Sequence, residues 1–286
     1  MRRQTFQIPL PSGLVLTLGE RTLVMAIVNV TPDSFSDGGA RVDPDIAIAD
    51  ALQMVQDGAD VLDIGGESTR PGAAPLPADE EWRRVGPVLE GLRGRVDVPI
   101  SIDTYKADIA ARALALGATI VNDVTSCEAD PGMAAVIARH QAGVVLMHHR
   151  GRSDAMYDRA TYRDVVAEVR AELADRVERV VAAGVARSRV MIDPGFGFAK
   201  RAEQSMTALA GLPGLASLGL PILSGPSRKS FLQFALGPRT PEERVWGTAA
   251  AVAASIWLGA HVVRVHDVKA MVDVVRVTDA LVAASV

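Results

Sequence analysis

Residues 117–122 read Gly117-Ala118-Thr119-Ile120-Val121-Asn122, a glycine followed by a short apolar run that ends on a polar residue. The same arrangement recurs at residues 58–63, 143–148 and 259–264. A glycine directly after a helix adopts the left-handed conformation that ends the helix. A short apolar run without alternation is typical of a strand buried on both faces, as in a parallel sheet. The repeat therefore predicts alternating helices and parallel strands.

The pattern extends along nearly the whole chain. It predicts strands near residues 24–29, 61–65, 99–103, 119–122, 144–148, 190–193, 221–224 and 262–266. Helices are predicted at 44–57, 78–93, 106–116, 131–141, 162–183, 203–211, 241–258 and 268–284. Eight near-equal strand–helix units favour a closed (β/α)8 barrel, the TIM-barrel fold of the α/β class, over an open doubly wound sheet. No linker or low-complexity stretch interrupts the series, so we expect one domain over residues 1–286.

The N-terminal segment and the starts of the predicted helices carry further signals. Apolar runs at 5–9 and 14–18, on either side of a Pro-Ser-Gly turn, predict a short N-terminal β-hairpin that covers the bottom of the barrel. Asp43 and Asp130 each precede a proline, as helix N-caps often do. The run Thr240-Pro241-Glu242-Glu243 has the spacing of a capping box and predicts a helix start.

Composition narrows the functional class. The 286 residues are 49% hydrophobic, enough to bury a full core, and the net charge of −4 excludes a global basic field for nucleic acid. No apolar run approaches the ~20 residues that span a bilayer, and Pro9 and Pro11 interrupt any export signal after Arg2-Arg3. The only cysteine, Cys127, cannot form an internal disulfide. We expect a cytoplasmic protein with small-molecule substrates and neither a nucleic-acid nor a membrane partner.

Polar residues follow every predicted strand, where barrel active sites lie. They are Asn29, Asp63, Asp103, Asn122, Asp123, His148, Asp193, Ser224, Arg264 and His266. Any one of them can be a solvated strand end, but a whole ring of Asp, Asn, Arg and His indicates directed hydrogen bonding. Carboxylates suit the amino and N–H donors of a heterocycle, and Arg264 beside His266 suits phosphate oxygens. The ring predicts a site for an amino-heterocycle with a phosphate tail.

Three loops after the strands have unusual compositions. Residues 31–39 and 65–73 are rich in glycine, hydroxyls and proline, which is typical either of plain turns or of mobile loops that present N–H groups to anions. Residues 224–230 place Arg228 and Lys229 after the seventh strand, a common phosphate neighbourhood in barrels. That stretch lacks the P-loop spacing. The five histidines show no spacing that predicts a metal cage.

Seven motifs at these strand ends resemble those of dihydropteroate synthases, in the same order. They occupy residues 28–39, 63–72, 101–104, 122–124, 193–198, 227–231 and 264–268. The resemblance implies a transferase of folate biosynthesis. Such an enzyme condenses 6-hydroxymethyl-7,8-dihydropterin pyrophosphate with p-aminobenzoate to give 7,8-dihydropteroate and pyrophosphate. It also implies a homodimer, a target of sulfonamides and a reaction in which pyrophosphate leaves before the amine attacks.

The resemblance also assigns residues. The pterin ring would bind Asp103, Asn122, Asp193 and Lys229. The diphosphate would bind Asn29, Thr69, Arg70, Arg264 and His266, with Asn29 as a ligand of the cofactor Mg²⁺. The p-aminobenzoate would lie against Phe35, Thr69, Pro71, Lys229 and Ser230 once the first two loops close. Catalysis would rest on Asp103, Lys229, Arg264 and His266.

The chain departs from the family pattern at Ala199, where glycine is usual, and at Gln204-Ser205, where His-Asn is usual. Ala199 matters only if its backbone needs a positive φ, and Ser205 can cap a helix nearly as well as asparagine. Two alternatives remain: a methyltransferase-like pterin-binding barrel that serves a corrinoid, and an inactive paralogue. The first has no use for the loops at 31–39 and 65–73, and the second would require damage at Lys229 or Arg264, which is not seen. A phosphosugar isomerase would require a glutamate after the sixth strand and a histidine after the fourth, and neither is present.

Overall fold

The computed structural model describes residues 3–11, 13–31, 43–68, 73–151 and 156–285. Within them, parallel strands form an eight-stranded sheet in the order β8-β7-β6-β5-β4-β3-β10-β9. The strands are β3 (Leu23–Asn29), β4 (Val61–Gly65), β5 (Ile100–Asp103), β6 (Ile120–Asp123), β7 (Gly143–Met147), β8 (Val190–Asp193), β9 (Leu223–Ser224) and β10 (Val262–Val265). A parallel bridge between Ile192 and Ile222 joins β8 to the segment leading into β9 and closes the sheet. The predicted (β/α)8 barrel is confirmed.

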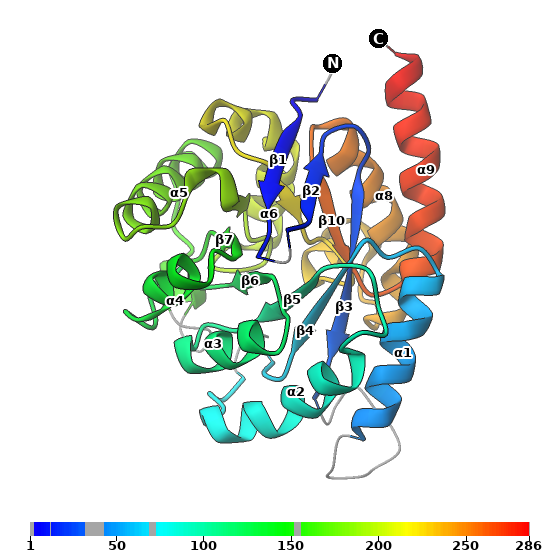
Figure 1. Cartoon of the computed structure of the whole chain (residues 1–286). Helices are drawn as coiled ribbons and strands as arrows, with labels where there is room; N and C mark the ends of the chain where they lie inside the picture. Colours follow the sequence, from blue (N-terminus) through cyan, green and yellow to red (C-terminus); the bar gives the residue numbers. More distant parts are fainter. Residues whose placement is uncertain (1–2, 12, 32–42, 69–72, 152–155, 286) are drawn as a thin grey trace.

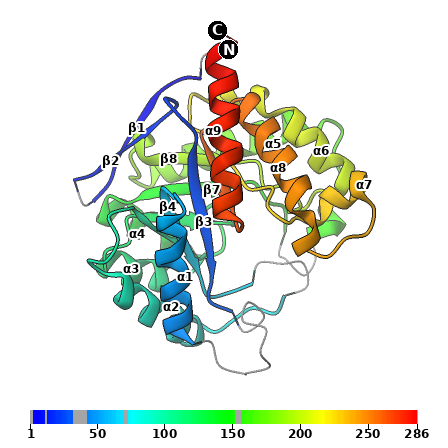
Figure 2. The same ribbon diagram turned by 90° about the vertical axis from the view of Figure 1, so that its right-hand side faces the viewer.

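Helices surround the barrel. They are α1 (Pro44–Gln56), α2 (Ala78–Leu92), α3 (Ala107–Ala115), α4 (Met133–His140), α5 (Val165–Ala182), α6 (Ala202–Ala210), α7 (Gln233–Leu236), α8 (Val245–Trp257) and α9 (Val268–Ala284). Figure 2 shows α1 to α4 on one side of the barrel and α5 to α8 on the other, with α9 between them. No helix in the described part of the chain is long and apolar enough to cross a membrane.

Most helix starts lie close to their predicted positions, and those described next differ in how the first turn is capped. Asp43 accepts a hydrogen bond from the backbone N–H of Asp45 and caps α1, as predicted. Asp130 instead caps a turn, accepting from Gly132 N, and α4 begins only at Met133. The predicted start of the fifth helix at residue 162 is three residues too early, because Asp164 caps α5. The capping-box stretch forms a 3-10 segment, Glu242–Arg244, before α8 begins.

The N-terminal hairpin closes the amino end of the barrel, as predicted. Strands β1 (Phe6–Pro9) and β2 (Val15–Leu18) pair antiparallel. Their buried side chains pack against the first inward residues of the barrel strands, in a cluster we call the plug. It comprises Ile8, Leu10, Leu16, Leu18, Leu23, Met25, Val61, Ile120, Val145, Met191, Leu223 and Val262. In Figure 1 the hairpin lies at the top, and β3 runs downward, away from it. The carboxyl ends of the strands therefore lie at the opposite end of the molecule.

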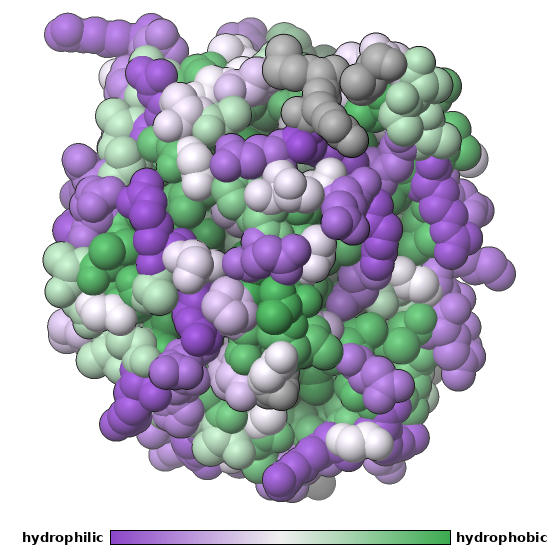
Figure 3. All heavy atoms as spheres, turned by 45° about the horizontal axis from the view of Figure 1, so that its top comes forward, coloured by the Kyte–Doolittle hydropathy of each residue, from purple (hydrophilic) through white to green (hydrophobic). Residues whose placement is uncertain are grey.

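The two faces of each strand belong to different cores. Leu62 and Ile64 of β4 belong to the outer cluster between strands and helices, whereas Val61 belongs to the plug. Alternation along a strand accounts for this division, since successive side chains point to opposite faces. The outside of the molecule around the hairpin is a mixture of hydrophilic and hydrophobic side chains (Figure 3).

Candidate active site

The site follows from alternation along the strands. The residue two places after an inward plug residue also points inward, one layer closer to the carboxyl ends. On four strands that residue is polar: Asp63 after Val61, Asn122 after Ile120, Asp193 after Met191, and Arg264 after Val262. On β5, Asp103 holds the same place after the buried Ser101, and we call these five residues the polar layer. Asp63 is fully buried, and Asn122 and Asp193 are about 95% buried. Apolar side chains close the amino end of the barrel, and polar side chains line it toward the carboxyl end.

Arg264 connects two carboxylates across the barrel. Its Nε donates to Asp63 Oδ2 at 2.6 Å, and its Nη2 donates to Asp103 Oδ2, also at 2.6 Å. Asn122 Nδ2 donates to the same oxygen of Asp63 at 2.9 Å. The other oxygens of Asp63 and Asp103, both Oδ1, are buried without a partner among the described residues. A buried acceptor without a donor is costly in free energy, so these oxygens suit the N–H groups of a ligand.

Burial in this layer shifts the pKa of its charged groups. Burial raises the pKa of Asp103 to about 7, although the charge of Arg264 opposes the shift. Burial alone would lower the pKa of Arg264, but Asp63 and Asp103 outweigh it, and the guanidinium stays charged. Asp103 is therefore a carboxyl that changes protonation near neutrality, a property typical of functional sites.

A second charged pair lies on the neighbouring strand ends. Asp193 Oδ1 accepts from Gly195 N at 2.7 Å, and Lys229 Nζ donates to Phe196 O at 2.6 Å. Lys229 also lies over the ring of Phe198, 4.7 Å from its centroid. Burial lowers the pKa of Lys229 to about 8 against the attraction of Asp193, and burial raises the pKa of Asp193 against the attraction of Lys229. The site thus holds a carboxylate beside a cation with an unusually low pKa.

The loops after β9 and β10 are fastened to each other. Ser227 Oγ lies 2.9 Å from His266 Nδ1 and accepts from His266 N at 3.1 Å. Arg228 forms two hydrogen bonds with Asp267, at 3.0 and 2.6 Å. These contacts fix where His266 stands beside the strand of Arg264. They also explain why Arg228, next to Lys229, is not a free cation for phosphate.

The structure brings together many of the residues that the sequence singled out. Asp103, Asn122 and Arg264 meet through Asp63, and Asp193 and Lys229 form the adjoining pair. Asn29 ends β3 in register with Gly65, and Ser230 is exposed at the start of a 3-10 segment. The remaining predicted residues, Phe35, Thr69, Arg70 and Pro71, lie outside the described residues.

Three polar residues at strand ends make structural contacts and do not belong to the polar layer. Asp123 accepts from the backbone of Thr125 and of Cys127, and so shapes the loop after β6. Ser224 donates to Ser255 of α8. His148 is fully buried against Lys200. Asp63 is the opposite case: the sequence placed it in the ring but gave it no role, and the structure shows that it links the Asn122 amide to Arg264. Its position two residues after the inward Val61 was the signal that could have identified it.

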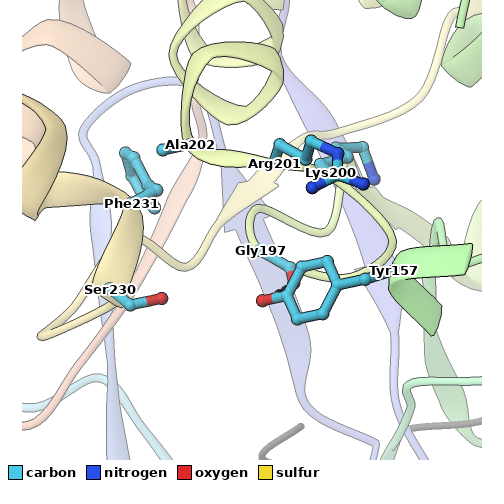
Figure 4. Close-up of a pocket in the computed structure, with 7 residues that line it drawn as sticks. All are labelled: Tyr157, Gly197, Lys200, Arg201, Ala202, Ser230 and Phe231. Atoms are coloured by element: carbon cyan, nitrogen blue, oxygen red, sulfur yellow. Dashed lines mark hydrogen bonds between the residues drawn. The ribbon is translucent and has the colours of Figure 1, made fainter. Parts of the chain in front are cut away.

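A cavity of about 260 Å³ lies between the turn at Gly197 and the segment that begins at Ser230. Its lining residues are Tyr157, Gly197, Lys200, Arg201, Ala202, Ser230 and Phe231. Figure 4 shows the Ser230 hydroxyl facing Gly197 and Tyr157 across the cavity, with Arg201 on the far side. Ser230 is therefore placed between this open space and its neighbour Lys229.

The donor set fits a magnesium ion held mainly by its ligand. The described ranges contain no group of three His, Cys, Asp or Glu side chains that could hold a metal. Asn29 offers a single amide oxygen at the end of β3. Mg²⁺ keeps several waters and commonly binds through one protein group together with substrate phosphates. An ion held in this way would take its other ligands from water and from a diphosphate.

The departure at Ala199 has a structural consequence. Its φ is +49°, in the left-handed region where a side chain is strained, so the condition raised by the sequence is met. Nearby, a Cβ on Gly195 would lie 2.0 Å from His148 O, so only glycine fits there. Ser205 Oγ accepts from Gly197 N at 3.1 Å, so it braces the turn rather than capping α6.

Comparison with known proteins gives a consistent result. The family described as pterin binding enzyme matches residues 25–266. A dihydropteroate synthase of Synechocystis sp. is 47% identical over 277 residues, covering 96% of each chain. The Bacillus subtilis dihydropteroate synthase is 44% identical, covering 93% of this chain and 90% of the relative.

Solved structures give the same family. The Xanthomonas albilineans dihydropteroate synthase with 4-aminobenzoic acid superposes with a TM-score of 0.90 at 44% identity, covering 97% of this chain and 98% of that one. The same enzyme in complex with 7,8-dihydropteroate gives a TM-score of 0.86 at 42% identity, covering 96% and 98%. The chain therefore belongs to the dihydropteroate synthase family of pterin-binding enzymes, a family of transferases.

Proposed function

We propose that the polar layer binds the pterin ring and that Arg264 and His266 hold the diphosphate in the reaction of this family. The enzyme condenses 6-hydroxymethyl-7,8-dihydropterin pyrophosphate with p-aminobenzoate, giving 7,8-dihydropteroate and pyrophosphate. The observation that carries the residue assignment is the unpartnered Oδ1 of Asp103, a buried acceptor within the barrel. The ring N–H and amino groups of a pterin are donors that would satisfy it.

The charges of the site match the charge that develops during the reaction. As the bond to the diphosphate breaks, negative charge grows on the leaving group and positive charge grows on the pterin methylene. Arg264, held by Asp63 and Asp103, stabilises the negative charge on the leaving diphosphate. The carboxylates of Asp103 and Asp193 stabilise the positive charge on the pterin methylene. Lys229, with Asn122, orients the ring. The aniline nitrogen is a neutral nucleophile, so no general base is required.

For p-aminobenzoate, we propose a place at the mouth of the barrel beside Lys229 and Ser230. The cavity at Ser230 supports this placement, because the exposed hydroxyl can donate to a carboxylate there. Phe35, Thr69 and Pro71 complete the proposal from the family resemblance, as Thr69 and Arg70 do for the diphosphate; these four residues are outside the described part of the chain.

The test is release of pyrophosphate by the purified protein from the pterin substrate, with and without p-aminobenzoate. We expect release with both substrates, together with formation of 7,8-dihydropteroate. Absence of turnover with intact pterin binding would support the inactive paralogue. Methyl transfer from a methylated folate, without pyrophosphate release, would support the methyltransferase-like barrel.

We further propose Mg²⁺ as the cofactor, with Asn29 supplying one oxygen ligand. Bound there, the ion would neutralise charge on the departing diphosphate. Calorimetry should show little binding of Mg²⁺ alone and clear binding of Mg²⁺ with pyrophosphate, weakened in Asn29→Ala. Equal binding of Mg²⁺ with and without pyrophosphate would contradict a ligand-borne ion.

We also propose that the chain is one domain that forms a homodimer in the cytoplasm. Large apolar side chains stand exposed on adjoining helices: Phe234 of α7 is 59% exposed, and Trp246 and Trp257 of α8 are 81% and 56% exposed. Clustered exposed aromatics are typical of protein interfaces. Light scattering should give a dimer for the native chain and a monomer for Trp246→Glu. Val15→Glu, on the hairpin, where Val15 is 49% exposed, is the control and should stay dimeric.

A further inference from the structure

Lys200 is almost completely buried, 1% exposed, on the far side of the turn that carries the site carbonyl of Phe196. Its Nζ lies 2.7 Å from His148 Nδ1, 3.1 Å from Gly195 O and 3.1 Å from Phe198 O. Three acceptors match the three protons of an ammonium group. Burial, together with the charges of Lys229 and Arg176, lowers the pKa of Lys200 well below its usual value against the attraction of Asp193. The geometry nevertheless requires the ammonium form, because three acceptors need three donated protons. Lys200 thus holds the turn at residues 195–198 through two of its backbone carbonyls.

The charge of Lys200 is connected to the surface through His148. Burial lowers the pKa of His148 to about 3, so its ring is neutral, with Nδ1 accepting from Lys200 and Nε2 donating to Glu172 at 3.1 Å. Hydrogen bonds from His148 and Arg150 outweigh burial and lower the pKa of Glu172 to about 2. A lysine ammonium, a neutral histidine and a carboxylate therefore form one chain of hydrogen bonds.

The turn at residues 195–198 lies between two lysines. Lys200 takes the carbonyls of Gly195 and Phe198, and Lys229 takes the carbonyl of Phe196 between them. The same turn donates Gly195 N to Asp193, so it positions both members of the second charged pair. Gly195 packs closely on the backbone of His148, where a Cβ would lie 2.0 Å from His148 O.

From this arrangement we propose that Lys200, with His148 and Glu172, is a positioning residue that sets the geometry of Asp193 and Lys229 for the pterin. The proposal rests on the pterin site proposed above. Lys200 acts on the pterin site through the carbonyls of the turn, to which its ammonium group donates. Without its ammonium, those two carbonyls lose their donor, the turn relaxes, and Lys229 loses a fixed partner in Phe196 O.

The experiment compares Lys200→Met with Arg3→Met. Arg3 is a matched buried cation at the opposite pole, with a 7% exposed side chain paired with Asp279. Both variants should melt at lower temperature. Only Lys200→Met should raise the Kd for a pterin, by tenfold or more, and the KM for the pterin substrate more than it lowers kcat.

A pH profile separates positioning from plain stability. The alkaline limb of pterin binding reports Lys229, whose charged neighbours are Asp193, Arg264 and Asp103. In Lys200→Met, a relaxed turn admits water to Lys229, and the limb should move to higher pH. In Arg3→Met the limb should stay at its native pH.

Glu172→Gln tests the outer end of the chain if Lys200→Met does not fold. Glu172 is 32% exposed, so the change is tolerated, yet it removes the charge opposite His148. It should raise the pterin Kd several-fold. The proposal would be overturned if folded Lys200→Met bound pterin with the native Kd and the native alkaline limb. If only Glu172→Gln folds, the same result in that variant would overturn it. Failure of the native protein to bind pterin would instead overturn the proposed function.

Discussion

Single residues in this site are held in place by opposite charges that would be costly to bury alone. Arg264 is shared between Asp63 and Asp103, and the charge of Asp193 favours the charged form of Lys229. Removing one partner of such a buried pair typically costs about 3–5 kcal/mol, because the other charge is left uncompensated. A substitution here therefore tests binding and stability together, and each experiment requires a control that separates them.

The first prediction concerns the pH dependence of pterin binding. The Asp103 acceptor must be ionised, and its pKa is raised to about 7; the Lys229 donor must be protonated, and its pKa is lowered to about 8. Affinity should therefore fall below about pH 7 and above about pH 8. Calorimetry from acid to alkaline pH measures the profile. Asp103→Asn should lower affinity throughout and flatten the acid limb, and an unchanged acid limb would assign it to another group.

The second prediction concerns Arg264. Arg264→Gln should weaken binding of the pterin diphosphate by about 100-fold or more, in line with ~3 kcal/mol for a lost charge-assisted contact. Binding of a pterin without diphosphate should weaken far less, because that ligand has no anion for Arg264 to contact. Arg21→Gln is the control, because Arg21 pairs with Asp60 at the amino end of the barrel, away from the site. Equal losses for the two ligands would show that Arg264 serves the barrel structure and not the diphosphate.

At the scale of elements, the turn between β8 and α6 departs most from regular geometry. Gly195, Gly197 and Ala199 all have positive φ values, of 65°, 79° and 49°. Such backbone conformations persist where surrounding contacts enforce them, and they concentrate at functional sites. Here the two lysines supply those contacts, so the strain of Ala199 is compatible with a defined site.

The third prediction compares two buried alanines. Ala199→Gly relieves a left-handed conformation that costs an L-residue about 1–2 kcal/mol, and this offsets the lost methyl burial of ~0.8 kcal/mol and the added chain entropy. The change should be neutral within about 1 kcal/mol. Ala110→Gly, in the interior of α3 and equally buried, gains no such relief and should cost about 1.5–2 kcal/mol. Urea unfolding measures both, and equal losses would mean that Ala199 is not strained.

At the scale of the whole molecule, stability and binding lie at opposite ends of the barrel. The plug fills the amino end with apolar side chains, and the polar layer occupies the carboxyl end. Active sites of such barrels lie at the carboxyl end, and residues of the other end serve stability. The two ends should therefore respond separately to substitution.

The fourth prediction tests that separation. Leu18 is fully buried in the plug, so Leu18→Ala should lower the free energy of unfolding by about 2–5 kcal/mol. Val15→Ala, on the same strand but 49% exposed, should cost less than about 0.5 kcal/mol. Neither change should alter the pterin Kd at a temperature where the protein is folded. A weaker Kd in Leu18→Ala would show that the hairpin is coupled to the site.

Local patterns along the chain were enough to predict the order of strands and helices and the hairpin, and to propose most of the residues for the pterin. These depend on local signals: apolar runs, glycines after helices and motifs contiguous along the chain. Its errors were local too, because two helices begin later than predicted. Asp130 caps a turn before α4, and Asp164, not Tyr162, marks the start of α5.

Tertiary structure alone decided which of these residues touch. Arg264 meets Asp63 across 201 residues and Asp103 across 161, and Lys200 meets His148 across 52. No local pattern encodes such pairs, because they depend on barrel closure and on which face of each strand points inward. Closure also buried the charges, and burial is what moved the pKa values of Asp103 and Lys229 toward neutrality.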